Sequence, residues 1–204
     1  VFTAALPARN NQELVGALKE LYPSVVPVGS VMETILNDVN AILHPAASLL
    51  NTGRIEYSKG EFYVYKEGIT SSVIRVMKAV DNERLAIVKA LGFEQIPFEK
   101  LLSDIGICPE GTLEEVVSHV YGAEDIKSPG SMQGRYIIED VPYGLVSIAS
   151  IGELVGVPTP VMKSLIALAS TINQVDYWKE GRTTEKLGIA KLSRSKLRKF
   201  LTEG

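Results

Sequence analysis

Apolar residues recur every three or four positions through most of the chain beyond residue 30, a spacing that places them on one face of an α-helix. The first of these runs begins with Ser30 and Glu33, which have the spacing of a capping box, and it continues to His44. Pro45 has no backbone N–H, so we expect it to kink or end this helix beside the histidine. Further helices are predicted over residues 69–91, 98–103, 112–121, 159–178 and 193–201; an apolar segment covers 144–155, and 54–65 fits either a strand or a helix.

The opening of the chain follows a different pattern. A strand-like stretch leads into a helix capped by Asn10, with Glu13 at its third position, and a second β-rich stretch follows. Such a β-α-β unit is typical of the end of an α/β domain. We therefore interpret residues 1–29 as the end of a nucleotide-binding domain and residues 30–204 as an all-α helical domain. Because the sequence starts with Val1 and runs at once into a strand, we expect it to be part of a longer polypeptide.

The composition indicates an ordinary folded domain, because 46% of the 204 residues are hydrophobic and 22% are charged. The formal net charge of -3 gives no reason to expect nucleic acid or an anionic membrane surface as a partner. No apolar run reaches the roughly 18 to 20 residues that a bilayer-spanning helix needs. One cysteine and two histidines exclude an internal disulfide and a Cys/His zinc site, so we expect a cytoplasmic protein without a metal.

The chain contains no glycine-rich dinucleotide-binding motif, no P-loop, no G-x-S-x-G elbow and no H-E-x-x-H motif. The candidate chemistry therefore rests on polar residues within the predicted helices. On one continuous helix, Asn37, Asn40 and His44 share a face. An imidazole exchanges protons near neutral pH because its ordinary pKa is about 6.5, although a histidine that only caps a helix carbonyl fits the same pattern.

A second polar cluster covers residues 134–145 and combines Arg135 with Glu139, Asp140 and two tyrosines. The guanidinium of Arg135 has a planar fork of donors that matches a carboxylate on a ligand. A structural ion pair between Arg135 and either acid explains the cluster equally well, so both interpretations stay open. Elsewhere we expect a surface position for His119, and either a solvated face or an internal ion-pair lock from Asp81, Glu83 and Arg84.

Five motifs, in the same order and at similar spacing, make residues 30–190 resemble the C-terminal helical domain of the octopine and nopaline dehydrogenase family. They are Asn-x-x-x-His-Pro at 40–45, Phe-Tyr-Val-Tyr-x-Glu-Gly-Ile-Thr at 62–70, Asp-x-Glu-Arg at 81–84, Arg-Tyr-x-x-Glu-Asp-Val-Pro-Tyr-Gly-Leu at 135–145 and Gly-Val-Pro-Thr-Pro at 156–160. Several motifs in one order are more specific than any single one. Residues 4–9 also resemble the late strands of that family's Rossmann domain.

The resemblance implies a fold like the C-terminal domain of 6-phosphogluconate dehydrogenase. It also implies that an amino acid and a 2-oxo acid condense to an imine, which NADH or NADPH reduces. The N-terminal Rossmann domain of the same polypeptide then holds most of the cofactor, so we expect this chain alone to be inactive. The family's catalytic histidine and partner aspartate fall on His44 and Asp140, and its carboxylate-binding arginine falls on Arg135. Asn40 joins Arg135 as a predicted substrate-binding residue.

Two other functions are compatible with the sequence. Ketopantoate reductases and related 2-hydroxy-acid dehydrogenases resemble the same two-domain plan, but they usually place a lysine on the catalytic helix. A non-enzymatic helical dimerisation module is the second alternative, and it predicts that the polar residues around His44 are exposed and not paired with Asp140. The identity of both substrates, the choice between NADH and NADPH, and the formation of a homodimer stay open.

Overall fold

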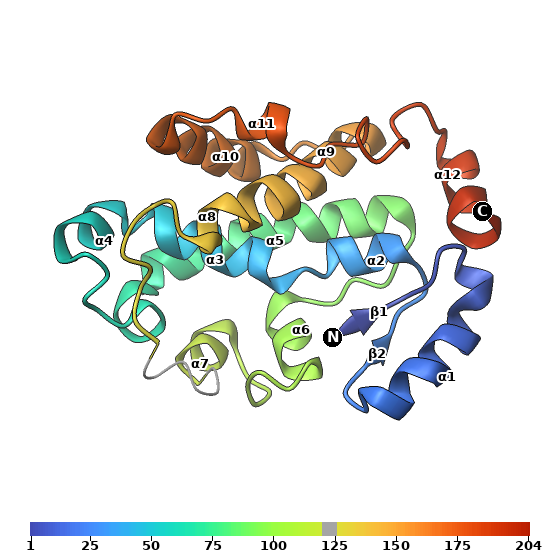
Figure 1. Ribbon diagram of the computed structural model, residues 1–204, viewed down its shortest axis with the longest axis horizontal. Coiled ribbons are helices and arrows are strands. Elements are labelled where there is room, and N and C mark those ends of the chain that lie inside the picture. Colours follow the sequence, from blue (N-terminus) through green and yellow to red (C-terminus); the bar gives the residue numbers. More distant parts are fainter. Residues whose placement is uncertain (120–125) are drawn as a thin grey trace.

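A computed structural model describes residues 1–119 and 126–204, and Figure 1 shows layers of helices with a small β-α-β unit at one end. Strands β1 (Phe2–Thr3) and β2 (Val26–Pro27) pair in parallel. The 3-10 helix η1 (Ala8–Asn10) and helix α1 (Asn11–Leu21) connect them. The expected β-α-β unit is therefore present, although Asn10 lies within η1 and its side chain makes no capping hydrogen bond.

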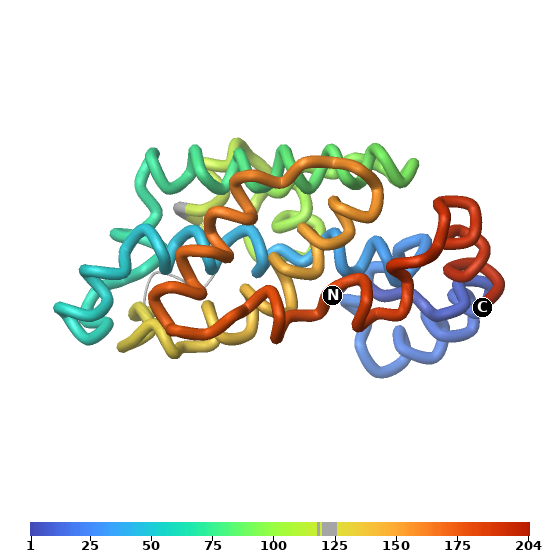
Figure 2. Tube along the Cα trace, turned by 90° about the horizontal axis from the view of Figure 1, so that it is seen from above, coloured from blue at the N-terminus to red at the C-terminus, as the bar shows by residue number. Residues whose placement is uncertain are grey.

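The rest of the described chain is helical, which confirms the all-α class. Figure 1 shows α9, α10 and α11 above a middle layer that contains α3, α5 and α8, with α6 and α7 below. The tube in Figure 2 shows α12 returning to the end of the molecule that carries the β-α-β unit. The elements of this part are α2 (Val31–Leu36), α3 (Val39–Leu49), α4 (Thr52–Ser58), the π-helix η2 (Val64–Gly68), α5 (Ser71–Leu91), α6 (Phe98–Asp104), α7 (Leu113–Ser118), α8 (Arg135–Ile138), the π-helix η4 (Asp140–Leu145), α9 (Val146–Val155), α10 (Pro160–Asn173), α11 (Tyr177–Glu180) and α12 (Arg194–Glu203).

Helix α5 is 21 residues long and packs against α3, α9 and α10. Its buried residues recur at helical spacing, and Val73, Val80 and Ile87 lie in the core. Gly92 follows the last turn with a φ of 80°, a left-handed conformation that glycine adopts without steric cost. The helix predicted over 69–91 is therefore confirmed, together with its glycine cap.

The first predicted helix is in fact two helices, α2 and α3, which are separated at Asn37 and Asp38. Asp38 is the N-cap of α3, where its side chain accepts a hydrogen bond from the backbone N–H of Asn40. Asn37 is the C-cap of α2, and its side-chain oxygen accepts a hydrogen bond from Arg84. The prediction that Asn37 shares a helix face with His44 is therefore wrong, because the two residues lie in different helices.

Pro45 does not end the helix that carries His44, because α3 continues to Leu49 with the proline inside it. A proline in a helix interior costs about 3 kcal/mol, since one backbone hydrogen bond is lost and the ring crowds the preceding turn. Packing offsets this cost, because all residues of α3 except Asn40 are buried. Full burial of one leucine or isoleucine contributes about 1.5–3 kcal/mol, and α3 buries Ile42 as well as Leu49.

The capping signals at other helix starts give mixed results. Thr112 and Glu115 form the expected capping box at the start of α7. The side chain of Ser30 makes no capping hydrogen bond, and its hydroxyl instead donates to the carboxylate of Glu33 at 3.4 Å. The predicted helix over 112–121 ends at Ser118, and its last two positions lie outside the described residues.

The structure settles the secondary structure of two further regions. The helix predicted over 159–178 ends at Asn173, because Gln174 adopts a left-handed conformation with a φ of 54°. A separate short helix, α11, follows it. Residues 54–65, which fit either a strand or a helix, contain most of α4 and the start of η2. This segment is therefore mainly helical, and it brings a tyrosine-rich stretch next to α3.

A buried charged cluster on α5 fixes the junction between α2 and α3. The side chain of Arg84 is fully buried and forms an ion pair with Asp81 at 2.7 Å. Its remaining N–H groups donate to the carbonyl oxygens of Leu36 and Ile96. Burial raises the pKa of Asp81, and the charge of Arg84 opposes that shift. The internal ion-pair lock is therefore correct for Asp81 and Arg84, whereas Glu83 accepts hydrogen bonds from backbone N–H groups at the start of α10.

Candidate active site

His44 and Asp140 form a buried pair although they are 96 residues apart in the sequence. His44 Nδ1 lies 2.6 Å from Asp140 Oδ2. An ionised carboxylate only accepts hydrogen bonds, so Nδ1 carries the hydrogen and Nε2 is the nitrogen left to exchange a proton. The two side chains are 9% and 11% exposed, and a charge-assisted hydrogen bond is strong in such a shielded place. This pairing contradicts what a non-enzymatic dimerisation module predicts.

Two tyrosines complete the surroundings of the imidazole. The Tyr65 hydroxyl lies 3.0 Å from His44 Nε2 and 3.4 Å from the Tyr136 hydroxyl. The ring of Tyr136 stacks on the imidazole, with centroids 3.8 Å apart and planes 6° apart. Burial raises the pKa of Tyr65 well above its ordinary value, and the hydrogen bond with Tyr136 adds to the shift, so the hydroxyl keeps its proton. The imidazole is therefore held at both nitrogens and on one face.

Three segments far apart in the sequence meet at this site. Helix α3 supplies His44, the π-helix η2 supplies Tyr65, and the continuous segment of α8 and η4 supplies Tyr136 and Asp140. Both π-helices are wider than an α-helix, and such turns often occur at functional sites. Helix η4 can lie directly on α3 because Gly144 has no side chain, since a Cβ there would lie 2.8 Å from the Cβ of Ala41.

A third carboxylate, Asp38, lies at the N-terminus of α3. Burial raises its pKa, a backbone hydrogen bond lowers it, and the charge of Asp140 raises it further. Asp38 also lines a cavity of about 370 Å³, together with Tyr143 and Arg182, whose guanidinium lies 5.3 Å from the ring centre of Tyr143. The cavity therefore borders the turn that carries Asp140, although neither Asp140 nor His44 lines it.

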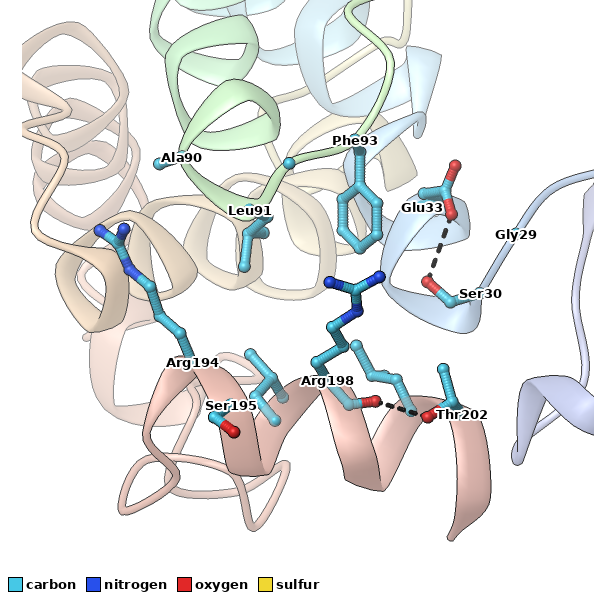
Figure 3. Close-up of a pocket in the computed structure, with 13 residues that line it drawn as sticks. Gly29, Ser30, Glu33, Ala90, Leu91, Phe93, Arg194, Ser195, Arg198 and Thr202 are labelled. Atoms are coloured by element: carbon cyan, nitrogen blue, oxygen red, sulfur yellow. Dashed lines mark hydrogen bonds between the residues drawn. The ribbon is translucent and has the colours of Figure 1, made fainter.

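A larger cavity of about 550 Å³ lies where α12 meets the ends of α2 and α5. Figure 3 shows the side chains of Arg194 and Arg198 extending from α12 toward α5, with Glu33 on another wall. Burial raises the pKa of the Glu33 carboxyl. Neither His44 nor the three side chains around its imidazole line this cavity, so cavity size does not mark the histidine site.

Within residues 1–119 and 126–204, no three His, Cys, Asp or Glu side chains are grouped so that they could hold a metal ion. In the same part of the chain, no helix combines the length and the apolar composition needed to cross a bilayer.

The family model for the α-helical domain of NAD/NADP octopine/nopaline dehydrogenases matches residues 27–173. The chain belongs to this family. The matched region begins within β2, ends with α10, and contains every member of the histidine site. The family inferred from five sequence motifs is therefore confirmed, and the chain is an opine dehydrogenase helical domain.

Curated relatives agree with this assignment. The opine dehydrogenase of Arthrobacter sp. (strain 1C) is 38% identical over 197 residues, which make up 96% of this chain and 54% of that protein. Protein ocs of Agrobacterium tumefaciens (strain Ach5) is 29% identical over 196 residues, 92% of this chain and 53% of the relative. The chain therefore spans about half the length of the curated relatives that it matches.

Solved structures of octopine dehydrogenase share the fold. One structure, with NADH and L-arginine, has a TM-score of 0.66 and 18% identity over 93% of this chain and 54% of the other. A second, with NADH and pyruvate, has a TM-score of 0.64 at the same identity and covers 53% of that chain. At this identity the likeness establishes the fold of the opine dehydrogenase domain and nothing finer.

The predicted site residues do not all lie at the same depth. Arg135 begins α8 with a side chain that is 67% exposed, and its Nε lies 3.6 Å from Glu139 Oε2. Asn40 is partly buried and lies one helical turn before His44 on α3. The structure thus brings His44 and Asp140 into contact, whereas Arg135 faces Glu139 and the backbone N–H of Asn40 donates to Asp38. The roles of all four remain predictions.

Sequence reasoning missed Tyr65 and Tyr136 as members of the site. Both tyrosines were within motifs that carried the family resemblance, but their contact with His44 joins three distant segments. The signal in the sequence is the presence of tyrosines within these motifs, because a tyrosine hydroxyl that becomes buried normally needs a hydrogen-bond partner. Asp38 was missed as well, because it was placed inside one continuous helix, although Asp is a preferred N-cap residue.

Proposed function

We propose that this domain supplies the proton-transfer and substrate-binding residues of an enzyme that condenses an amino acid with a 2-oxo acid. In that reaction the amine adds to the carbonyl, water leaves, and the resulting imine accepts a hydride to become a secondary amine. The addition, the loss of water and the reduction each require proton transfer. The buried His44–Asp140 pair in a domain of this family is the observation that supports the proposal.

Each member of the pair has a distinct role in this scheme. Asp140 holds the hydrogen on His44 Nδ1 and fixes the orientation of the ring, so that Nε2 is the nitrogen that exchanges a proton. A negative charge beside the ring also stabilises the imidazolium form, which is the form that donates a proton. His44 is therefore the proposed acid and base, and Asp140 is the residue that positions it.

The rest of the polypeptide is proposed to bind the nucleotide. Residues 1–29 form a β-α-β unit with strands of only two residues, and we propose that this unit is the end of that domain. A dinucleotide pyrophosphate is usually held by a glycine-rich turn between a strand and a helix, and the chain has no such motif. NADH or NADPH, held by the other half, supplies the hydride.

The proposed substrates follow from the family. Octopine dehydrogenase structures contain L-arginine in one case and pyruvate in another, which are an amino acid and a 2-oxo acid. We assign the carboxylate of the 2-oxo acid to Arg135, because an exposed guanidinium one residue before Tyr136 can present two parallel donors. Asn40, one turn before His44, is proposed as a further polar contact for the substrate.

The test uses the full-length protein with NADH or NADPH, a panel of amino acids and a panel of 2-oxo acids that includes pyruvate. Mass spectrometry is expected to detect a secondary-amine dicarboxylate formed from both substrates, and the His44→Gln variant serves as the matched control. A 2-hydroxy acid that contains no amino-acid nitrogen would instead indicate a 2-hydroxy-acid dehydrogenase. If no substrate pair causes oxidation of either cofactor, the proposed reaction is wrong.

A further inference from the structure

The Nε2 atom of His44 already has a hydrogen-bonding partner within the protein. The Tyr65 hydroxyl lies 3.0 Å from this nitrogen, and the Tyr136 hydroxyl lies 3.4 Å beyond. Starting from the carboxylate of Asp140, four polar groups therefore form one chain: carboxylate, imidazole, hydroxyl and hydroxyl. His44 and Asp140 are buried, whereas the two tyrosines are partly exposed, so the chain leads from the interior toward the surface.

This row of hydrogen-bonded groups can provide a partner for Nε2 in both charge states of the imidazole. With His44 neutral, the Tyr65 O–H donates to Nε2 and the Tyr136 O–H donates to Tyr65. With His44 protonated, Nε2–H donates to the oxygen of Tyr65, whose O–H then donates to Tyr136. A hydroxyl is both a donor and an acceptor, so rotation about two C–O bonds is enough to reverse the chain. Reversible hydrogen-bond polarity is what proton conduction through side chains requires.

Tyr65 stays protonated, so its hydroxyl can pass protons along but cannot store one by ionising. Burial raises the pKa of Tyr65 well above its ordinary value, and the Tyr136 hydrogen bond and the Asp140 charge act in the same direction. Tyr65 therefore passes a proton on only when it receives another at the same time. The stacked ring of Tyr136 adds a geometric role, because it keeps the imidazole in the plane in which Nε2 points at Tyr65.

We propose that Tyr65 and Tyr136 form the path by which His44 regains a proton from solvent after each turnover; the inference rests on the proposed function. The condensation and reduction consume one proton for each product molecule, in addition to the hydride. The substrate takes the place of the Tyr65 hydroxyl at Nε2 and receives the proton there. After the product leaves, the hydroxyl returns to Nε2, and Tyr136 takes a proton from water and passes its own to Tyr65. Tyr65 in turn passes its proton to Nε2. Both hydroxyls end unchanged, and no electrons move.

This role predicts a separation between two kinetic measurements on the full-length protein. In Tyr65→Phe, the steady-state rate is expected to fall by about tenfold or more, at the low end of the scale for a proton-transfer group. The first turnover, followed by rapid mixing of cofactor and substrates with enzyme whose histidine is already protonated, is expected to keep its rate. Small buffer acids should restore the steady-state rate in proportion to their concentration, because they deliver protons in place of the hydroxyl.

Two further variants sharpen the test. Tyr136→Phe keeps the stacked ring but removes the outer hydroxyl, so it should show a smaller loss with the same rescue by buffer. Tyr57→Phe is the matched control, because Tyr57 is 93% exposed and its hydroxyl lies in solvent. An equal loss in the first turnover and in the steady state, or a loss that buffer does not restore, would overturn the proposal. A Tyr65→Phe rate within twofold of the wild type would overturn it as well.

The path can be tested even if the wild-type protein forms no opine, a result that would contradict the proposed function only. In the full-length protein labelled with ¹⁵N at histidine, NMR measures how fast the ring N–H protons of His44 exchange with water, and His44→Gln identifies the signal. Exchange should slow by about tenfold in Tyr65→Phe but not in Tyr57→Phe. Unchanged exchange in Tyr65→Phe would show that protons reach His44 by another route.

Discussion

The imidazole of His44 is fixed by three different interactions. Asp140 binds one nitrogen, Tyr65 binds the other, and Tyr136 covers one face of the ring. A side chain with only two rotatable bonds that is held in this way has little freedom left. This is the arrangement expected of a catalytic group, because its position is set before the substrate arrives.

The first prediction concerns the pair itself. In the full-length enzyme, His44→Ala should lower kcat/KM by roughly 10²- to 10⁴-fold, the usual effect of a positioned acid-base group. Asp140→Asn should lower it in the same direction without unfolding the domain. The losses should be far from additive, because an orienting carboxylate has nothing to orient once the imidazole is gone. Steady-state kinetics on both single variants and the double variant measures this, and additive losses would show that the two residues act independently.

A second prediction concerns Arg135, which is exposed and only loosely paired with Glu139. Arg135→Lys keeps the charge but removes the planar fork, so KM for the 2-oxo acid should rise while kcat changes less. Kinetics with pyruvate varied at saturating amino acid and cofactor measures this effect. An unchanged KM for pyruvate would show that Arg135 is not the carboxylate anchor. A lower melting temperature in that case would support a purely structural ion pair.

At the scale of elements, the site depends on where helices are interrupted. The break at Asn37 and Asp38 lets α3 start in a new direction, and the Arg84 side chain holds the end of α2 in place. The π-helix η4 then brings its first residue, Asp140, against α3. A regular helix in either place would rotate the side chains that follow, so these irregular turns set the distance between the two halves of the pair.

A third prediction follows from the contact between η4 and α3. In Gly144→Ala, the new Cβ would lie 2.8 Å from that of Ala41, so the two elements must move apart. Such overpacking typically costs about 1–3 kcal/mol. We expect a lower melting temperature and a larger loss of kcat than of substrate affinity, because Asp140 moves with η4. Gly156→Ala is a useful comparison, since a Cβ there meets no atom within 4 Å although its φ of 75° adds strain.

That comparison separates stability from catalysis. Gly156→Ala should also destabilise the domain, because a left-handed backbone disfavours a residue with a Cβ. It should leave kcat nearly unchanged, since Gly156 is the cap of α9 and not part of the contact with α3. Equal kcat values in the two variants would show that the close approach at Gly144 has no bearing on the site.

At the scale of the whole molecule, the chain covers about half of each curated relative that it matches. Figures 1 and 2 show the β-α-β unit and α12 together at one end of the helical layers. Only two short strands pair there, and a two-stranded unit is seldom stable without further packing. We therefore expect that end to lie against the proposed nucleotide-binding domain in the full-length protein.

The fourth prediction concerns the proposal that the other domain binds the cofactor. The chain of 204 residues should bind NADH and NADPH weakly or not at all, because it has no glycine-rich turn for the pyrophosphate. Isothermal titration calorimetry compares this chain with the full-length protein, for which binding is expected. Low-micromolar binding to the chain alone would mean that the helical domain holds the cofactor by itself.

Much of this protein could be read from its sequence. The 3.6-residue period determined the all-α class and the long helix α5, since a run of that length leaves no other way to bury one apolar face. Five motifs in one order identified the family and singled out His44 and Asp140. Signals of this kind depend only on residues that are close in sequence, so they can be recognised without knowledge of the fold.

Other features were decided only by tertiary structure. Pro45 lies inside α3 because packing around that helix outweighs the lost hydrogen bond, and packing cannot be read from neighbours in sequence. Asn37 lies at the end of α2 and not on the helix face of His44, and Arg84, 47 residues away, donates a hydrogen bond to it there. Tyr65 likewise belongs to the site only through tertiary contacts, because its two hydrogen-bond partners lie on other segments. Contacts between distant segments form only when the whole chain has folded, so the sequence indicates the candidate residues and the fold decides what holds them.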